Sequence, residues 1–545
     1  MIIDANESEN TKKDLHTDIC VVGAGIAGIA FAREIAKSGK EVLLLESGGL
    51  EPKDSAQELN SGKNTGRPYY ELNEARERAF GGSSHMWHVD KEWQINTGSL
   101  PEEIVRLRGM DAIDFRKREW VPYSGWPISK DDLDPYYSQA HELFKIGPYQ
   151  YEADFWEEKL GLKKIPFRKN RVKTTVFQFA RNNIFYTDYR RELEASDNIT
   201  VYLNATALEI KLRENAKSVA SVKARSSAGN EFTVNATTYV LAQGGLETPR
   251  LMLLSNNVMN MGVGNHNDLV GRFFMEHPHL WTGKLIPSDQ QYFQNGSLYG
   301  LNVYDSVPFL GKIVLSDDVM KEERLMNHSL NILHRIPMAS LLKPSRAFHG
   351  LKKSFKTLDI SRQMVRDFKT LASNVDVVSY AAWNKIAQKR NNKGYQRTNK
   401  FDGYQLNIMS EQAPNPNSRV ILGQERDAFG QHKMNLSWEV SRDDMRSMRR
   451  FLEIINRELK KDSLGEIISL PSDDSVPDSL HGGYHHMGTT RMSDDPKQGV
   501  VDKNCRVHGM NNLYVAGSSV FPTCGYANPT LTLAALTLRL ADHLK

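Results

Sequence analysis

The chain of 545 residues is 40% hydrophobic and 25% charged, the composition of an ordinary soluble protein long enough for two or more lobes and a large core. Its three cysteines, Cys20, Cys505 and Cys524, are too few and too scattered for a disulfide framework or a thiolate metal cluster, so we expect a reducing, cytoplasmic compartment. The N-terminus is polar and glycines interrupt the longest apolar stretch, and we therefore expect neither a signal peptide nor a membrane span.

The first predicted element is a buried parallel strand over residues 19–22, within DICVVGAGIAGIAFAREIAKSGKEVLLLESGG. It is followed by the motif GxGxxG, by a helical pattern and by a second strand over residues 42–45, which ends in Glu46; the motif glycines are Gly23, Gly25 and Gly28. In this βαβ arrangement the glycines admit a pyrophosphate, the helix N-terminus stabilises it, and the acid binds a ribose hydroxyl. We therefore predict a dinucleotide site; a glycine-rich turn without a ligand is the alternative.

A second glycine loop, RAFGGSSHMWHV, has four small residues at its centre: Gly81, Gly82, Ser83 and Ser84. A flat ring or a phosphate could approach the backbone of such a loop closely. Farther along, residues 238–242 predict another strand, followed by a glycine turn and a helix. A last helix is predicted to begin at Pro529, because Asn528 is a favoured N-cap and apolar residues recur at helical spacing over residues 531–538.

Together with NDLVGRFFMEHP and NLYVAGSSVFPTCGYANPTLTLAALTLRLADHL, these segments resemble the glucose-methanol-choline (GMC) family of flavin oxidoreductases. The resemblance covers residues 18–544 and is weakest between about 278 and 404. The segments VPYSGWPISKDDLDPYY and EQAPNPNSRVILGQERDAFG are similar to the branch of the pyranose oxidases and glycoside 3-oxidising enzymes. An FAD cofactor is thus implied.

The resemblance also implies which residues hold the FAD. It places the flavin ring at the N-terminus of the last helix, whose dipole would stabilise by about 0.3–2 kcal/mol the negative charge that the ring acquires near N1 on reduction. Asn528 is either a simple helix cap or, as the resemblance implies, an active-site residue. The cofactor-binding residues expected in total are Gly23, Gly25, Gly28, Glu46, Gly81, Gly82, Ser83, Ser84, Gly517, Ser518, Asn528, Pro529 and Thr530.

Three histidines lie in the segment HGGYHHMGTTRM, residues 481–492. His481 and His485 could share a metal on a helix, but two glycines between them disfavour a helix and no acid or cysteine completes a ligand set, so we predict no metal. The resemblance implies a catalytic imidazole three residues before a glycine, which is the position of His485 relative to Gly488. We take His485 as the base and His486 as a neighbour that orients the loop; a register one residue later is the alternative.

These residue types suit the oxidation of an alcohol, which removes the hydroxyl proton and transfers the carbon-bound hydrogen to the flavin as hydride. A neutral imidazole such as His485 can accept that proton, and an uncharged amide such as Asn528 can hold the same oxygen. The resemblance implies a sugar or glycoside as substrate, with an electron acceptor that the sequence does not specify. An aliphatic or sterol-like alcohol, or a catalytically silent flavin-binding module, are the alternatives.

The sequence also bears on how the flavin is attached. Some pyranose oxidases bind it covalently through a histidine directly before a tryptophan, whereas here Met86 precedes Trp87 and His85 lies one place earlier. We therefore expect noncovalent FAD, with His85 either near the flavin ring or an ordinary loop residue.

The motifs predict an α/β chain, α+β overall, with a discontinuous Rossmann-like FAD-binding domain made of residues 14–89, 199–278 and 475–545. Residues 90–198 and 279–474 are expected to form a substrate-binding domain, which the resemblance implies is a sheet with helices over one face. Residues 406–423 supply its predicted strands, around a turn at Pro414 and Pro416.

The insertion at residues 343–400 is strongly basic. It contains 14 Lys and Arg against 3 acids, so its net charge of +11 leaves the remaining chain at −7. Its apolar residues suggest amphipathic helices with a basic face, which would form a solvated lid or oligomer contact, or would bind an anionic membrane surface or a phosphorylated glycan. Nucleic acid is not expected, because no recognition motif accompanies the charge.

Overall fold

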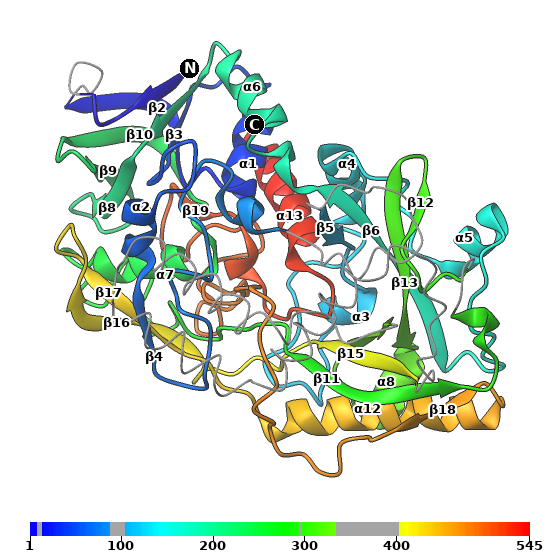
Figure 1. The fold of residues 1–545 in the computed structure, drawn as a ribbon. Coiled ribbons are helices and arrows are strands. Elements are labelled where there is room, and N and C mark those ends of the chain that lie inside the picture. Colours follow the sequence, from blue (N-terminus) through cyan, green and yellow to red (C-terminus); the bar gives the residue numbers. More distant parts are fainter. Residues whose placement is uncertain (8–12, 88–103, 294–296, 334–402) are drawn as a thin grey trace, which may run out of the picture.

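A computed structural model describes residues 1–7, 13–87, 104–293, 297–333 and 403–545 (Figure 1). One lobe is built on an eight-stranded sheet in the order β1-β7-β3-β2-β10-β9-β8, with β19 beside β10. Strand β2 pairs in parallel with β3 and with β10, which confirms the predicted Rossmann-like core. The strands are β1 (Ile2–Asp4), β2 (Asp14–Val22), β3 (Val42–Leu45), β7 (Ile199–Leu203), β8 (Ala205–Leu212), β9 (Val219–Ser226), β10 (Glu231–Leu241) and β19 (Leu513–Val515).

Two helices from opposite ends of the chain pack together beside this sheet: α1 (Ile26–Ala36) and α13 (Pro529–Leu544). Helix α1 follows the first glycine motif, and α13 begins at the predicted residue. Strand β3 is buried at all four positions, as expected for an apolar strand in a parallel sheet covered on both faces. The N-termini of both helices are thereby held beside the same sheet.

The other lobe is built on a second eight-stranded sheet, in the order β18-β11-β15-β14-β13-β6-β5 with β12 beside β13. Helix α12 (Arg442–Lys461) lies along one face, where Phe451 and Ile455 pack with sheet residues such as Ile313 and Ile408 (Figure 1). A capping box between Ser441 and Asp444 begins this helix. The strands are β5 (Ile104–Leu107), β6 (Val172–Arg181), β11 (His279–Pro287), β12 (Asn302–Tyr304), β13 (Val307–Leu315), β14 (His328–Leu333), β15 (Tyr404–Ser410) and β18 (Gly465–Ile468).

The two strands predicted around Pro414 and Pro416 exist, but they do not share a sheet. Strand β15 belongs to the second sheet, whereas β16 (Arg419–Arg426) pairs with β17 (His432–Ser437), which in turn pairs with β4 (Gly62–Asn64). The segment between β15 and β16 therefore connects two sheets instead of forming a hairpin turn.

The remaining helices are short. They are α2 (Asp54–Gln57), α3 (Ala112–Phe115), α4 (Asp134–Phe144), α5 (Ala153–Leu160), α6 (Asp188–Glu194), α7 (Gly244–Leu254) and α8 (Asp317–Glu323), with 3-10 turns η2 (Glu58–Asn60), η3 (Gly82–Met86), η5 (Asn182–Ile184), η6 (Gln290–Tyr292) and η8 (Ser518–Val520). Within the described ranges, no helix has the length and apolar character needed to cross a membrane.

The described part of the segment at residues 90–198, which starts at residue 104, is divided between the lobes. Its strands β5 and β6 lie in the second sheet, but helix α4 packs on α13, and Tyr137, Phe144 and Tyr189 belong to the core of the first lobe. The Tyr137 hydroxyl lies 2.8 Å from the Thr532 hydroxyl on α13, so the first lobe includes part of this segment in addition to the three segments expected from the motifs. The basic insertion at residues 343–400 lies outside the described residues.

Candidate active site

A pocket opens at the carboxyl ends of the parallel strands β2, β3 and β10, where Val22, Leu45 and Ala242 line it. Ligands of parallel α/β sheets bind at this edge. At Gly23, with φ of +105°, a Cβ would lie 2.8 Å from the Ala242 carbonyl oxygen, so only glycine fits between the strands. The first glycine motif thus closes the turn that shapes the pocket.

Most of the predicted cofactor residues line this pocket: Gly23, Gly25, Glu46, Gly82, Ser83, Gly517, Ser518, Pro529 and Thr530. Gly28, Gly81, Ser84 and Asn528 are not among the lining residues. Gly28 instead packs against the turn, since a Cβ there would lie 1.9 Å from the Gly23 oxygen. Ser84 is buried and donates to the Gly81 carbonyl at 2.8 Å, so it supports the second glycine loop from behind.

Glu46 is buried, and its carboxylate accepts hydrogen bonds from two loops. One oxygen accepts from the Ala24 N–H at 3.0 Å and the other from the Gly48 N–H at 2.8 Å. Burial raises the pKa of Glu46, and these two N–H donors oppose that rise. The carboxylate therefore fastens the first glycine motif to the end of β3 while it lines the pocket.

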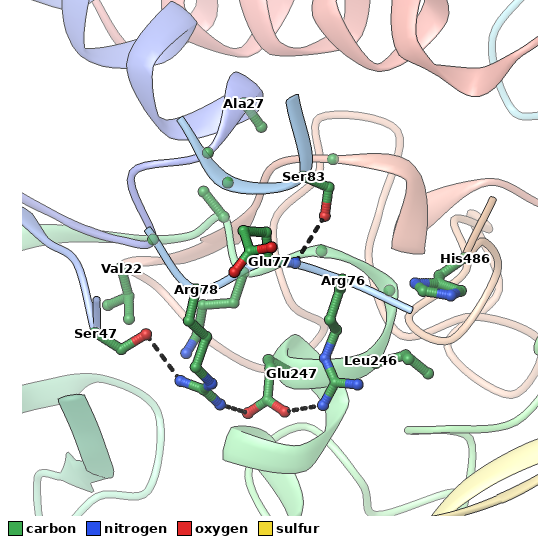
Figure 2. A pocket seen from close by; sticks show the side chains of 18 of the residues that line it. Val22, Ala27, Ser47, Arg76, Glu77, Arg78, Ser83, Leu246, Glu247 and His486 are labelled. Carbon is green, nitrogen blue, oxygen red and sulfur yellow. Dashed lines mark hydrogen bonds and ion pairs between the residues drawn. The ribbon is translucent and has the colours of Figure 1, made fainter. Parts of the chain in front are cut away.

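A buried ionic cluster that the sequence analysis missed also lines the pocket (Figure 2). The Glu247 carboxylate on α7 contacts Arg76 at 2.6 Å and Arg78 at 2.8 Å, and Arg78 donates to the Ser47 hydroxyl at 2.8 Å. Burial alone would raise the pKa of Glu247, but Arg78, Arg250 and Arg76 hold it well below its usual range. Arg-Glu-Arg just before the second glycine loop is the only sequence signal for this cluster.

The pocket fits FAD in its donor chemistry. The glycine turn leaves the N-terminus of α1 without a side-chain cap, so its N–H groups remain available to a pyrophosphate. Buried arginines, a carboxylate and the N-terminus of α13 complete the lining. The same pocket continues to Tyr484, His485 and His486, so a ligand that fills it reaches the histidine segment.

At that end the structure brings His485 and Asn528 together, 43 residues apart in sequence. The Asn528 Nδ2 lies 3.0 Å from the His485 Nε2. The expected capping bond is absent, because the Asn528 side chain makes no cap hydrogen bond to α13. Its amide faces the imidazole instead, and its Oδ1 is buried with no hydrogen-bond partner among the described residues. An available acceptor thus lies beside the imidazole.

A third histidine, His277, determines which nitrogen of His485 carries the proton. The His277 Nε2 lies 3.2 Å from the Cys524 carbonyl oxygen, which can only accept, so Nε2 must be protonated. In neutral His277 the Nδ1 is then an acceptor, and it lies 2.9 Å from the His485 Nδ1. His485 therefore donates through Nδ1 and presents the lone pair of Nε2 toward Asn528. His277 lies in FFMEHPH, where nothing in the sequence distinguished it from its neighbours.

Glu276 holds the backbone of the histidine segment. Its buried carboxylate accepts from the backbone N–H groups of Gly483 at 2.9 Å and His485 at 3.0 Å, and from the Tyr69 hydroxyl. Burial raises the pKa of Glu276, against which these donors act. One carboxylate thereby positions the loop on which His485 lies.

The other histidines point elsewhere. His486 contacts the Tyr69 hydroxyl through Nε2 at 3.0 Å, and burial lowers its pKa to about 3. His481 stacks on His279, with ring centroids 5.4 Å apart. His85 stacks on Tyr186 and contacts the Phe80 carbonyl, so it does not line the pocket. No cluster of His, Cys, Asp or Glu suited to a metal ion occurs in the described part of the chain.

Burial determines the protonation states of the histidines at the end of the pocket near His485. It lowers the pKa of His485 well below its ordinary value, and His277 and Arg106 lower it further. Burial likewise lowers the pKa of His277 to about 4. Both imidazoles are therefore neutral at physiological pH, which is the state needed to accept a proton.

Known families match both halves of this site. The family described as FAD dependent oxidoreductase matches residues 18–259, and the family described as GMC oxidoreductase matches residues 414–537. The chain belongs to the GMC oxidoreductases. The glycine motifs lie in the first matched range and the His485–Asn528 pair in the second, so this GMC oxidoreductase is an FAD-dependent enzyme, as the resemblance implied.

Relatives and solved structures agree with that family. The chain is 23% identical to the fructose dehydrogenase large subunit of Gluconobacter japonicus, over 98% of each chain. It is 20% identical to 2-methyl-1,2-propanediol dehydrogenase of Mycolicibacterium austroafricanum, over 97% of this chain and 95% of the relative. A crystal structure of formate oxidase has the same fold, with a TM-score of 0.53, 18% identity and coverage of 98% and 99%.

Proposed function

We propose that this GMC oxidoreductase oxidises a hydroxyl group of a sugar or glycoside to a carbonyl, with His485 as the base and Asn528 as the residue that positions the substrate oxygen. One observation carries the proposal: the lone pair of His485 Nε2 faces the Asn528 amide at 3.0 Å, at the end of the pocket that suits FAD. The likeness to fructose dehydrogenase supports a sugar substrate.

When bound, FAD supplies the acceptor for the hydride that leaves the substrate carbon. The residues of this chain handle the proton. A substrate hydroxyl that enters between the two side chains donates to His485 Nε2 and accepts from Asn528 Nδ2, replacing their direct contact. His277 keeps the His485 Nδ1 protonated, so that the free lone pair stays on the substrate side.

The alternative substrate is a small non-sugar alcohol, which the likeness to 2-methyl-1,2-propanediol dehydrogenase favours. An anaerobic screen separates the two, because bleaching of the flavin absorbance by sugars and glycosides, but not by diols, is the result expected. Bleaching by diols alone would contradict the sugar proposal. No bleaching by any alcohol would indicate a silent flavin-binding module.

The base is tested with two neighbouring variants. His485→Ala should bind FAD normally but reduce it at least about a hundredfold more slowly, the scale of a lost general base. His486→Ala should be much milder, because His486 faces Tyr69 and not Asn528. The opposite order would move the base by one residue, and two variants with parent rates would remove the histidines from the mechanism.

Noncovalent attachment of FAD is part of this proposal. Met86 precedes Trp87, and His85 is held by Phe80 and Tyr186 away from the pocket lining. Acid precipitation of the holoenzyme should therefore release FAD into the supernatant. Yellow colour that stays with the precipitated polypeptide would show a covalent link.

A further inference from the structure

The face of the second sheet opposite α12 carries buried polar atoms that have no hydrogen-bond partner in the described part of the chain. Paired residues of an antiparallel sheet share a face, and Trp281, Asn407 and Asn331 are opposite one another on β11, β15 and β14. Lys312, opposite Thr175, continues this row on β13. We call this side, defined by His279, Thr175, Lys312, Ser329, Asn331 and Asn407, the inner face.

The inner face is directed toward the catalytic histidines. His279 on β11 is two residues from His277, which contacts His485. Phe177, also on the inner face, packs with Tyr526, two residues before Asn528. Lys312 contacts the Phe177 ring, which connects the lysine to the loop that ends at Asn528.

Lys312 is the residue that most needs an explanation. It is 0% exposed, and among the described residues its Nζ has neither a hydrogen-bond partner nor an acid within ion-pair distance. Its Nζ lies 4.0 Å from the centre of the Phe177 ring. Burial, with Arg106 and Arg108 nearby, lowers the pKa of Lys312 well below its usual value. A buried amine of this kind is suited to an anionic ligand, which would favour its protonated form and form an ion pair with it.

The neighbouring side-chain amides of Asn331 and Asn407 are uncharged, and together they offer one donor and one acceptor. Asn331 donates to Asn407 at 3.2 Å, which leaves the Asn331 Oδ1 and the Asn407 Nδ2 buried without partners within the described ranges. Rotating both amides by 180° leaves the same pair, one donor and one acceptor, so the conclusion does not depend on the assignment. A hydroxyl group both donates and accepts, and therefore matches this amide pair. The Ser329 hydroxyl, also without a partner, adds to the same polar surface.

We propose that the substrate is an acidic sugar, whose carboxylate or phosphate binds Lys312 while its ring hydroxyls bind Asn331 and Asn407. This inference rests on the proposed function, because it places a second part of the substrate on the inner face while the reacting hydroxyl lies at His485. The anion supplies the charge partner that Lys312 lacks, and a neutral sugar would leave that lysine unpaired in a dry site.

Binding without turnover provides the first test, on the oxidised holoenzyme. Tetrahydropyran-2-carboxylate has the ring and the acid of a uronate but no hydroxyl to oxidise, and tetrahydropyran-2-carboxamide is its neutral counterpart. The carboxylate should perturb the flavin absorbance with a Kd at least tenfold lower than the carboxamide. Lys312→Met should abolish this difference, whereas Lys173→Met, which alters an exposed lysine on β6, should preserve it.

Turnover provides the second test. Anaerobic flavin reduction by the methyl glycoside of a hexuronic acid, by a hexose 6-phosphate and by the neutral methyl hexoside distinguishes a carboxylate from a phosphate. One of the two acidic sugars should reach half-maximal rate at a concentration at least tenfold below that of the neutral sugar, and Lys312→Met should remove the advantage. Selective carboxylate binding with no reduction by any alcohol would contradict the proposed function but not the anion site.

Lys312→Met also has a stability readout. The variant replaces an unpaired buried amine by an unbranched apolar side chain against Phe177, so its melting temperature should equal or exceed that of the parent. Equal Kd values for the carboxylate and the carboxamide in the parent protein would overturn the anion site. A Lys312→Met protein that keeps the tenfold preference would overturn it as well.

Discussion

At the scale of single residues, hydrogen bonds from the Cys524 carbonyl through His277 to His485 determine that the lone pair of His485 lies on Nε2. The Cys524 carbonyl determines the tautomer of His277, and His277 determines that of His485. A general base is effective only if its acceptor nitrogen faces the substrate. The geometry therefore assigns a positioning role to His277, which touches His485 and not the reacting oxygen.

Replacement of His277 tests that role. His277→Ala removes the acceptor for the His485 Nδ1–H, and the rate of flavin reduction at its pH plateau should fall about tenfold or more. His277→Gln can still accept that hydrogen bond and should retain most of the rate. Stopped-flow measures both rates, and thermal melts check that both variants are folded. Equal rate losses in the two variants would indicate only structural damage.

Asn528 separates catalysis from helix capping. Because its side chain makes no cap hydrogen bond, Asn528→Ala should leave the melting temperature close to that of the parent. The variant loses the N–H that holds the substrate oxygen, so flavin reduction should slow by about 10²–10³-fold, as for other donors aimed at a reacting oxygen. Stopped-flow and thermal melts check both expectations. A large stability loss at an unchanged rate would make Asn528 a structural residue.

At the scale of elements, the pocket depends on segments that are distant in sequence. Glu247 on α7 joins the loop with Arg76 and Arg78, and Arg250 on the same helix contacts Asp427 at 2.6 Å near β17. The cluster thus ties α7, the loop before the second glycine motif and the small third sheet together. Removing one buried charge leaves the others uncompensated.

Glu247→Gln should therefore lower the free energy of unfolding by about 3–5 kcal/mol, because three buried guanidinium groups lose their shared carboxylate. The matched control is Glu192→Gln, whose carboxylate is 51% exposed and contacts Arg33 at 2.6 Å; this exposed pair should change stability by about 0–1 kcal/mol. Urea unfolding measures both. Equal changes in the free energy of unfolding for the two variants would show that burial does not increase the contribution of the cluster to stability.

At the scale of the whole molecule, buried histidines make stability depend on pH. Burial lowers the pKa of His328 to about 3 and that of His486 to about 3, and His277, His279 and His485 are lowered too. Below about pH 6.5 the unfolded chain binds protons at these positions and the folded chain does not. The folded state should therefore lose stability as the pH falls from 6.5 toward 4.

His328 isolates one such contribution, because its ring nitrogens contact the Ser410 and Ser447 hydroxyls and neither His485 nor Asn528. In His328→Asn the slope of unfolding free energy against pH, measured between pH 6 and 5 by urea titration of the holoenzyme, should be smaller by about 1.4 kcal/mol per pH unit. An unchanged slope would mean that His328 is protonated in the fold.

The sequence alone determined the features that depend on local order. GxGxxG between two apolar strands predicts β2, α1 and β3, because the glycine turn and the apolar runs are contiguous, and Pro529 predicts the start of α13. The motifs that indicate the two matched families and the FAD cofactor are also contiguous in sequence, so they could be recognised without the structure.

Only the tertiary structure showed the roles that depend on long-range contact. His277, Glu276 and the Arg76–Glu247 cluster act through partners up to hundreds of residues away, and no periodic pattern marks them. The Asn528 side chain faces His485 instead of capping its helix, because the fold offers that imidazole at 3.0 Å. In the sequence Lys312 looks like an ordinary strand residue. The sheet register places it on the inner face, where it is buried with no acid beside it among the described residues, and the proposed anion site depends on that placement.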